Sequence, residues 1–267
     1  MADVPGSALP SPTLDPTSHR TIVIGASNVA QSLGRVIQLA DQSFGPRMNL
    51  MIAGGRGRSF GSSSYFAMRR LPSILHCELW NAAAAQPMQT TTAVVTDVGN
   101  DILYGRSVDT INAWVHECLA RLCGFQAKIT LVGLPLARVR RLNARAFYFF
   151  RTFLIPRSRM DLQTTLKRAE EVDERLRAAA QECGAAFVEP HPTWYGLDPI
   201  HLRSAHAQEA WRCYLSGAAQ AFAERPKVSN SLYYQAITPH ERWIMGRRQQ
   251  RAQPSIQLKS GSVVSLY

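Results

Sequence analysis

Ser27 and the pair Asp198-x-x-His201 are the residues of this chain whose types and spacing could do chemistry. Two residues three positions apart in a helical turn can face one point, so Asp198 and His201 can meet. A carboxylate beside a histidine fixes the tautomer of the imidazole and stabilises the imidazolium that forms when the ring takes a proton. A serine nucleophile needs such a base, so these three residues could carry out nucleophilic catalysis. The alternative is structural, because Ser27 and Asp198 are also of the types that cap helix N-termini.

Groups that could hold an oxyanion occur after two other predicted strands. Residues 54–61, Gly-Gly-Arg-Gly-Arg-Ser-Phe-Gly, offer backbone N–H groups, and Asn100 offers a side-chain amide. Both kinds of donor can stabilise a developing oxyanion. A phosphate-binding loop is another interpretation of the Gly-rich turn, although the Gly-Lys-Ser/Thr ending is absent. Arg56 and Arg58 could contact an anionic substrate group or face water, and Asn100 could be an ordinary turn residue.

Buried strands alternate with helices along most of the chain. Short apolar, β-branched runs predict strands at 20–25, 48–53, 91–98, 128–132 and 186–188. Apolar spacing predicts helices at 28–40, roughly 62–70, 161–183 and about 203–223. It also predicts a helix after the 91–98 strand that ends at Gly124. This alternation predicts an α/β fold of three layers, α/β/α, around a five-stranded parallel sheet of the flavodoxin-like type. Because parallel strands end at one edge of a sheet, we expect Ser27, the Gly-rich turn and Asn100 to lie together.

Four short blocks, in order, resemble those of the SGNH hydrolases, also called GDSL esterases/lipases. The blocks are Gly25-Ala26-Ser27-Asn28, Gly57-Arg58-Ser59, Gly99-Asn100-Asp101 and Asp198-Pro199-Ile200-His201, and the resemblance covers about residues 20–222. Gly54 and Gly55 fit the second block nearly as well as Gly57 by their distance from the preceding strand. One departure is that Ala26 stands where the family usually has Asp before its nucleophile.

The resemblance implies a serine esterase that needs no metal or cofactor. Ser27 would be the nucleophile and would also contribute its own backbone N–H to the oxyanion hole. Gly57 would contribute a second N–H, and the Asn100 side chain would be the remaining donor. His201 would be the general base, and Asp198 would orient it. Catalysis would proceed through an acyl-enzyme on Ser27.

The leading prediction is therefore hydrolysis of carboxylic esters, with a small-molecule or lipid ester as substrate. A carbohydrate or small-molecule acetylesterase is an alternative to a lipid esterase. A non-catalytic binding module that uses its basic tail is an alternative of another class, but such a module has no need of the catalytic set, and no specific nucleic acid is expected. A nucleotide-binding oxidoreductase is disfavoured because residues 25–34 lack the Gly-x-Gly-x-x-Gly spacing.

The formal net charge of +11 is unevenly placed. Residues 138–159 contain seven Arg and no acidic residue, interleaved with Phe and Tyr. If helical, the segment 136–159 is a basic aromatic insertion that could lie on an anionic membrane surface, cover the site as a lid or pack against the core. Residues 224–267 hold seven Lys or Arg and two Glu, and residues 254–267 predict a hairpin around 259–261.

The expected organisation is a flexible N-terminal segment over 1–19, a hydrolase domain over 20–223 and a basic C-terminal extension over 224–267. The five cysteines are scattered, and no apolar run approaches the length that spans a bilayer. The N-terminal residues lack the pattern of a secretory signal. We therefore expect a cytoplasmic protein, with a peripheral membrane location as the alternative.

Overall fold

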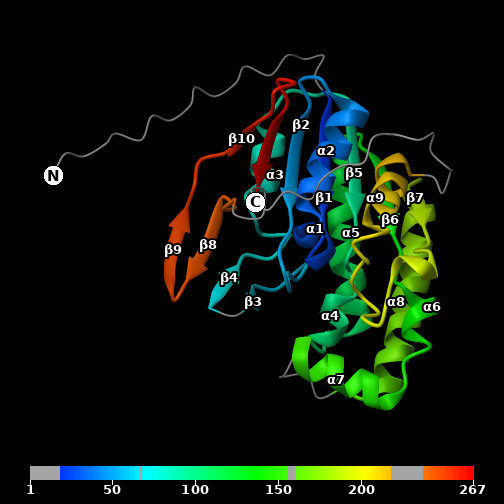
Figure 1. Ribbon diagram of the computed structural model, residues 1–267. Helices are drawn as coiled ribbons and strands as arrows, with labels where there is room; N and C mark the ends of the chain where they lie inside the picture. Colours follow the sequence, from blue (N-terminus) through cyan, green and yellow to red (C-terminus); the bar gives the residue numbers. More distant parts are fainter. Residues whose placement is uncertain (1–18, 67, 155–159, 218–236) are drawn as a thin grey trace.

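The computed structural model describes residues 19–66, 68–154, 160–217 and 237–267 (Figure 1). The predicted N-terminal segment up to residue 18, the end of the predicted insertion at 155–159 and the start of the predicted C-terminal extension lie outside the described residues. His19 is described, and its ring stacks on Phe44 with centroids 4.4 Å apart. No helix in the described residues is long and apolar enough to cross a membrane.

A seven-stranded sheet forms the centre of the described chain, in the order β10-β11-β2-β1-β5-β6-β7. The five predicted strands are present, are mutually parallel and lie next to one another: β1 (Arg20–Ile24), β2 (Asn49–Ala53), β5 (Thr91–Val95), β6 (Lys128–Val132) and β7 (Ala186–Val188). The count of five was wrong because the C-terminal hairpin joins the sheet. β11 (Val263–Leu266) pairs parallel with β2, and β10 (Ile256–Gln257) pairs antiparallel with β11. All four residues of β11 are buried, so it covers an edge that β2 would otherwise expose.

Helices cover both faces of this sheet, because alternate strand residues point to opposite sides. Ile22 and Ile24 belong to one core cluster and Val23 to the other. The first cluster includes residues of α3 (Leu79–Ala84), α5 (Val108–Gly124) and α8 (Leu162–Glu182), and the second includes residues of α1 (Ser27–Gln31), α2 (Leu33–Phe44) and α9 (Ala207–Ser216). The single helix predicted over 28–40 is instead two helices, α1 and α2, with Ser32 between them.

A second sheet of four antiparallel strands occurs in the described residues, in the order β3-β4-β8-β9. Its strands are β3 (Ser64–Phe66), β4 (Arg69–Leu71), β8 (Glu241–Ile244) and β9 (Arg247–Gln250). The helix predicted near 62–70 was wrong, because this stretch forms the β3–β4 hairpin. Its partner β8 comes from the distant C-terminal tail, with Arg69 opposite Ile244, so no local pattern could reveal it.

The remaining short helices gather at one end of the molecule, beside the carboxyl edge of the main sheet (Figure 1). They are α4 (Asn100–Leu103), α6 (Leu136–Val139) and α7 (Ala144–Leu154), and a 3-10 turn, η1 (Pro192–Trp194), precedes the loop that carries His201. The predicted basic aromatic insertion thus contributes α6 and α7. The small sheet projects to the left of α4 in this view, with β3 nearest to it (Figure 1).

Candidate active site

Ser27 lies at the junction that the sequence predicts, immediately after β1 and its two-residue turn. α1 begins at Ser27, and Ala26 occupies the N-cap position without any side-chain cap. The capping interpretation of Ser27 therefore does not match the structure, since the serine is the first helical residue and not the cap. Ser27 is 8% exposed, and it lines a pocket at the carboxyl edge of the sheet. Its hydroxyl sits where the partial positive charge of a helix N-terminus is available.

Asn100 lines the same pocket and begins α4. Its Nδ2 is buried and has no hydrogen-bond partner in the part of the chain that the structure describes. Leaving a buried donor unsatisfied is costly, so such a group in a pocket calls for an explanation. An unpaired amide donor in the same pocket as a buried serine is suited to donate a hydrogen bond to an oxyanion.

The pocket has a volume of about 110 Å³, and the rest of its lining is mostly apolar. Val139, Leu142 and Phe147 line it from the segment 136–159, and Ile102 and Leu134 line it from elsewhere. Phe147 is buried, although the other side chains of α7 whose burial the structure describes are mostly exposed. Helices α6 and α7 therefore form part of the pocket wall, with Phe147 as the inward-facing aromatic.

His201 and Asp198 meet as their spacing predicts. Nδ1 of His201 lies 2.6 Å from Oδ2 of Asp198, and the other carboxylate oxygen accepts the backbone N–H groups of Ile200 and His201 at 3.1 and 3.3 Å. Burial raises the pKa of Asp198, but the hydrogen bond and charge of His201 outweigh it and hold that pKa below its usual value. An ionised Asp198 accepts a hydrogen bond from Nδ1–H of His201, and this tautomer leaves Nε2 unprotonated as the atom that can act as a base.

The structure brings Ser27 and Asn100 into one pocket, and the loop of His201 reaches the same pocket through Pro199 and Ile200. His201 itself is not among the lining residues, and among the described residues no hydrogen bond joins its ring to Ser27. Catalytic hydrogen bonds are often long in ligand-free structures and tighten when substrate binds.

Asn28, which the sequence analysis did not single out, ties the serine turn to the histidine loop. Its Nδ2 donates to the carbonyl oxygen of Ile200 at 2.9 Å, and its Oδ1 accepts the N–H of Leu202 at 2.8 Å. The two backbone groups flank His201 in sequence. A single buried side chain next to Ser27 therefore fixes the loop that carries the histidine.

Asp97 holds the other side of the same turn. Its Oδ2 accepts the N–H groups of Ala26 and Asn28 at 2.8 and 2.9 Å, and its Oδ1 accepts Nδ2 of Asn28 at 2.7 Å. The turn at Ala26, which lacks the acidic side chain usual at that position, is thus stabilised by the carboxylate of Asp97 from the loop after β5. Asp97 has a φ of 62°, an uncommon conformation outside glycine. The sequence analysis missed it because the predicted strand ran to residue 98, whereas β5 ends at Val95.

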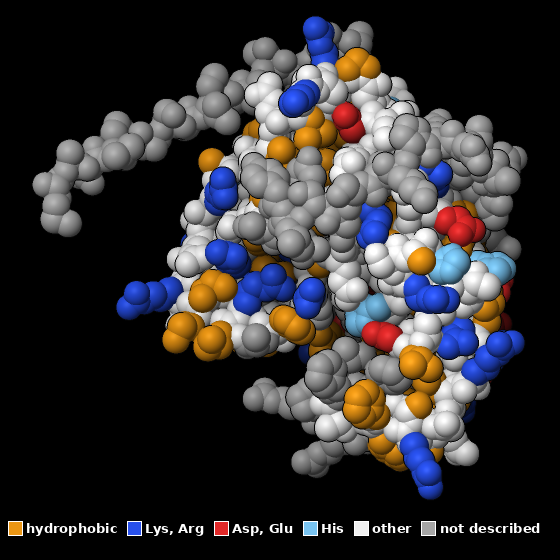
Figure 2. All heavy atoms as spheres, in the orientation of Figure 1, with side chains coloured by type: hydrophobic (Ala, Val, Ile, Leu, Met, Phe, Trp, Pro, Cys, Tyr) orange, Lys and Arg blue, Asp and Glu red, His pale blue; other side chains and the backbone are white. Residues whose placement is uncertain are grey.

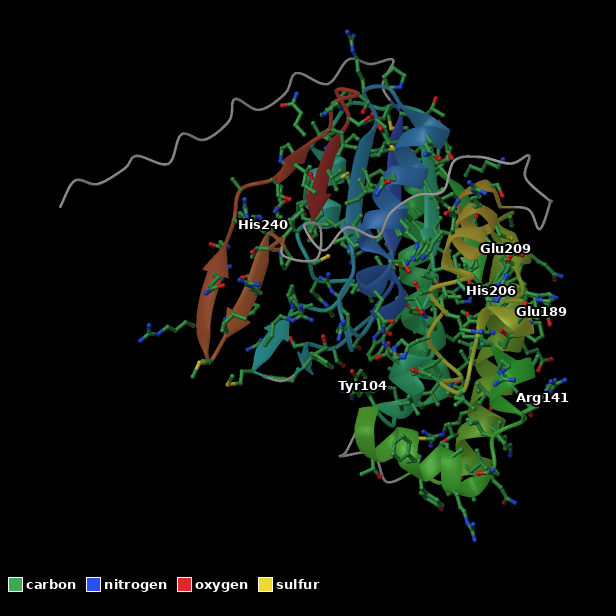
Figure 3. The ribbon with its side chains drawn as sticks, viewed as in Figure 1. Tyr104, Arg141, Glu189, His206, Glu209 and His240 are labelled. Atoms are coloured by element: carbon green, nitrogen blue, oxygen red, sulfur yellow. The ribbon has the colours of Figure 1, made fainter. Side chains whose placement is uncertain are left out.

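Gly57 occupies a tight turn in which the N–H of Arg58 donates to the carbonyl oxygen of Gly55 at 3.0 Å. The φ of Gly57 is 69°, and a Cβ there would lie 2.9 Å from the hydroxyl oxygen of Tyr104, so both conformation and space call for glycine. Tyr104, labelled in Figure 3, donates that hydroxyl to the carbonyl oxygen of Gly57 at 2.6 Å. Gly57 does not line the pocket.

Among the alternatives to Gly57, Gly55 already donates its N–H to the carbonyl oxygen of Ala26 at 3.3 Å. Gly54 remains an alternative to Gly57. Arg58 is fully buried and donates to backbone carbonyl oxygens of Gly54, Pro72 and Tyr267. It is therefore buried in the fold and does not face water.

Asp101 fixes the Gly-rich loop relative to Asn100. It is completely buried, accepts the hydroxyl of Ser59 and accepts the N–H of Phe60 at 2.9 Å. Burial raises the pKa of Asp101 to about 6, against the lowering effect of these hydrogen bonds. The short helix α4 thus presents Asn100 to the pocket and holds the neighbouring loop with Asp101.

Among the described residues, no group of three or more His, Cys, Asp or Glu side chains is arranged to hold a metal ion. No protein-family model and no curated protein matches the chain.

Several solved structures have a similar arrangement of helices and strands. The native aryl esterase of M. smegmatis is 13% identical, and the match covers 73% of this chain and 100% of that chain with a TM-score of 0.49. AlinE4, named as an SGNH-hydrolase family esterase, is 18% identical over 72% of this chain and 90% of its own, with a TM-score of 0.44. An acetyl xylan esterase, AlAXEase, is 10% identical over 72% and 96%, with a TM-score of 0.47.

Proposed function

We propose that this chain is a serine hydrolase that cleaves carboxylic esters through an acyl-enzyme on Ser27. The observation that carries the proposal is the pocket in which Ser27 and the unpartnered amide of Asn100 meet, with the Asp198–His201 pair on the adjoining loop. A structural serine needs neither an unsatisfied amide beside it nor an oriented histidine close by.

In the proposed reaction, Nε2 of His201 takes the proton of the Ser27 hydroxyl while Oγ attacks the ester carbonyl carbon. Asp198 keeps the imidazole in the required tautomer and stabilises the imidazolium. The oxyanion is proposed to be held by the amide of Asn100 and the N–H of Ser27, which both line the pocket, together with the N–H of Gly57 or Gly54 from the Gly-rich loop. His201 then protonates the departing alcohol, and water, deprotonated by His201, releases the acid and restores Ser27.

The apolar pocket is proposed to hold the acyl group of the ester. A volume of about 110 Å³ suits a short acyl chain, and Phe147 closes one side of it. Each methylene that a pocket accommodates or excludes changes the transition-state energy by about 1–3 kcal/mol. The side chain of Phe147 is thus proposed to set the chain length that the enzyme accepts.

Replacing Phe147 with Ala should therefore shift the preference toward longer acyl chains. We expect the ratio of kcat/KM for a hexanoyl over an acetyl p-nitrophenyl ester to rise by about tenfold. Phe149→Ala is the matched control, because Phe149 is another aromatic residue of α7 and is 66% exposed. An equal ratio in the wild type and Phe147→Ala would remove Phe147 from the acyl pocket.

Labelling with a fluorophosphonate tests the function itself. An activated serine displaces fluoride from phosphorus and becomes covalently phosphonylated, so the wild type should be labelled on the peptide that contains Ser27. Ser27→Ala should not be labelled, and His201→Ala should be labelled far more slowly. Absence of labelling in the folded wild type would contradict the proposal and favour a binding module that retains the fold.

A further inference from the structure

An exposed apolar surface caps the small sheet and has no role in the proposed reaction. We define the hairpin-tip surface as Tyr65, Phe66, Met68 and Met245, whose side chains are 70%, 43%, 68% and 72% exposed. These residues come from two hairpins that are far apart in the sequence. The N–H of Met245 donates to the carbonyl oxygen of Met68 at 3.0 Å, so the two hairpin tips are held side by side. Figure 2 shows hydrophobic side chains gathered with Lys or Arg side chains over this sheet.

The strands behind the hairpin-tip surface are strongly basic. In the described residues they carry five arginines and a single acid, Glu241, which pairs with Arg248. Burial lowers the pKa of Arg69, and the nearby like charges of Arg58, Arg242 and Arg56 lower it further. No carboxylate among the described residues lies within ion-pair distance of Arg56, Arg69 or Arg242. An anion bound here would relieve this repulsion.

The hairpin-tip surface adjoins the proposed active site. Phe66 lies beside Gly57, since a Cβ on that glycine would come 3.8 Å from its ring. On the other side of α4, α7 exposes Phe149 (66%) at the same end of the molecule (Figure 1). A ligand that contacts the hairpin tips would therefore lie next to the Gly-rich loop that holds Gly57.

We propose that the hairpin-tip surface docks on an anionic phospholipid bilayer. Met68 and Met245 enter the boundary between headgroups and acyl chains, while Arg69 and Arg242 bind lipid phosphates. The exposed methionines at the hairpin tips are flexible and apolar, so they suit an apolar, deformable partner. They cannot donate hydrogen bonds to a phosphate or a base, so the surface favours a membrane over a nucleic acid. The inference goes beyond the proposed function and does not depend on it.

The test uses full-length protein with Ser27→Ala, so that no lipid is hydrolysed while binding is measured. Sedimentation is compared for phosphatidylcholine vesicles with and without phosphatidylglycerol, at low and high salt. We expect binding about tenfold tighter to the anionic vesicles and its loss at high salt. Met68→Ser/Met245→Ser and Arg69→Gln/Arg242→Gln should each weaken that binding by about fivefold.

The matched controls are Met88→Ser and Lys259→Gln, which change an exposed methionine and an exposed lysine away from the small sheet. They should bind anionic vesicles as the unmodified chain does, and thermal unfolding shows that each variant is folded. Equal binding to both vesicle types, no binding, or full binding by both double variants would overturn the docking surface. Binding of a uridine oligonucleotide in place of vesicles would also overturn it.

The two proposals fail in distinguishable ways. Wild-type protein that hydrolyses a soluble ester but does not sediment with vesicles retains the esterase function and loses the docking surface. Protein that binds anionic vesicles through the hairpin tips but is neither labelled by fluorophosphonate nor active on soluble esters retains the docking surface and loses the esterase function.

Discussion

Replacing Ser27 with Ala should lower kcat for a soluble short-chain ester by about 10⁴-fold to 10⁶-fold. The substitution removes only a hydroxyl, leaves the pocket in place and deletes the one atom that forms the acyl-enzyme. His201→Ala should cost a similar factor, since Ser27 would then lack the base that takes its proton. The double variant should be about as active as either single variant, because the nucleophile and its base act as one unit.

Steady-state hydrolysis of p-nitrophenyl acetate by purified variants measures these effects. Ser32→Ala is the matched control, because Ser32 is a buried serine at the start of α2, five residues further along the same segment. It should keep wild-type activity to within about twofold, as is usual for a residue that touches no reacting group. Losses from Ser27→Ala and His201→Ala that multiply in the double variant would show that the two residues do not act together.

The parallel centre of the fold was predictable because its information is local. Each of the five strands is a short apolar run, and Ser27 and Asn100 each start a helix shortly after a strand. Ser27, the Gly-rich turn and Asn100 could be placed at one edge from strand direction alone. The structure places Ser27 and Asn100 in one pocket as expected, while the catalytic roles remain proposals.

What the sequence could not reveal depends on pairing between distant segments. β11 and β8 are ordinary short strands, and nothing in their residues shows that one extends the main sheet at β2 and the other adds to β4. The same holds for Asn28 and Asp97, because an Asn and an Asp in turns are common. Their role comes from hydrogen bonds to residues 69 to 174 positions away.

Replacing Asn28 with Ala should lower kcat by about 10²-fold with little change in KM. Asn28 satisfies the carbonyl oxygen of Ile200 and the N–H of Leu202, and so fixes the loop of His201 relative to Ser27. Without it the loop is free to shift, and a displacement of about 1 Å at a catalytic group can cost about 10²-fold in rate. The two backbone groups left unpaired should also lower the free energy of unfolding by about 2 kcal/mol.

The separation of kcat from stability decides whether Asn28 positions the site or only stabilises the fold. Asn49→Ala is the matched control, since Asn49 is a buried asparagine at the amino end of β2 whose Nδ2 donates to Gln86 at 2.7 Å. It should lose stability but keep kcat, because it lies at the opposite edge of the sheet from Ser27. If Asn28→Ala likewise destabilised the protein and left kcat unchanged well below its Tm, Asn28 would be a structural residue. The position of the His201 loop would then depend on other contacts.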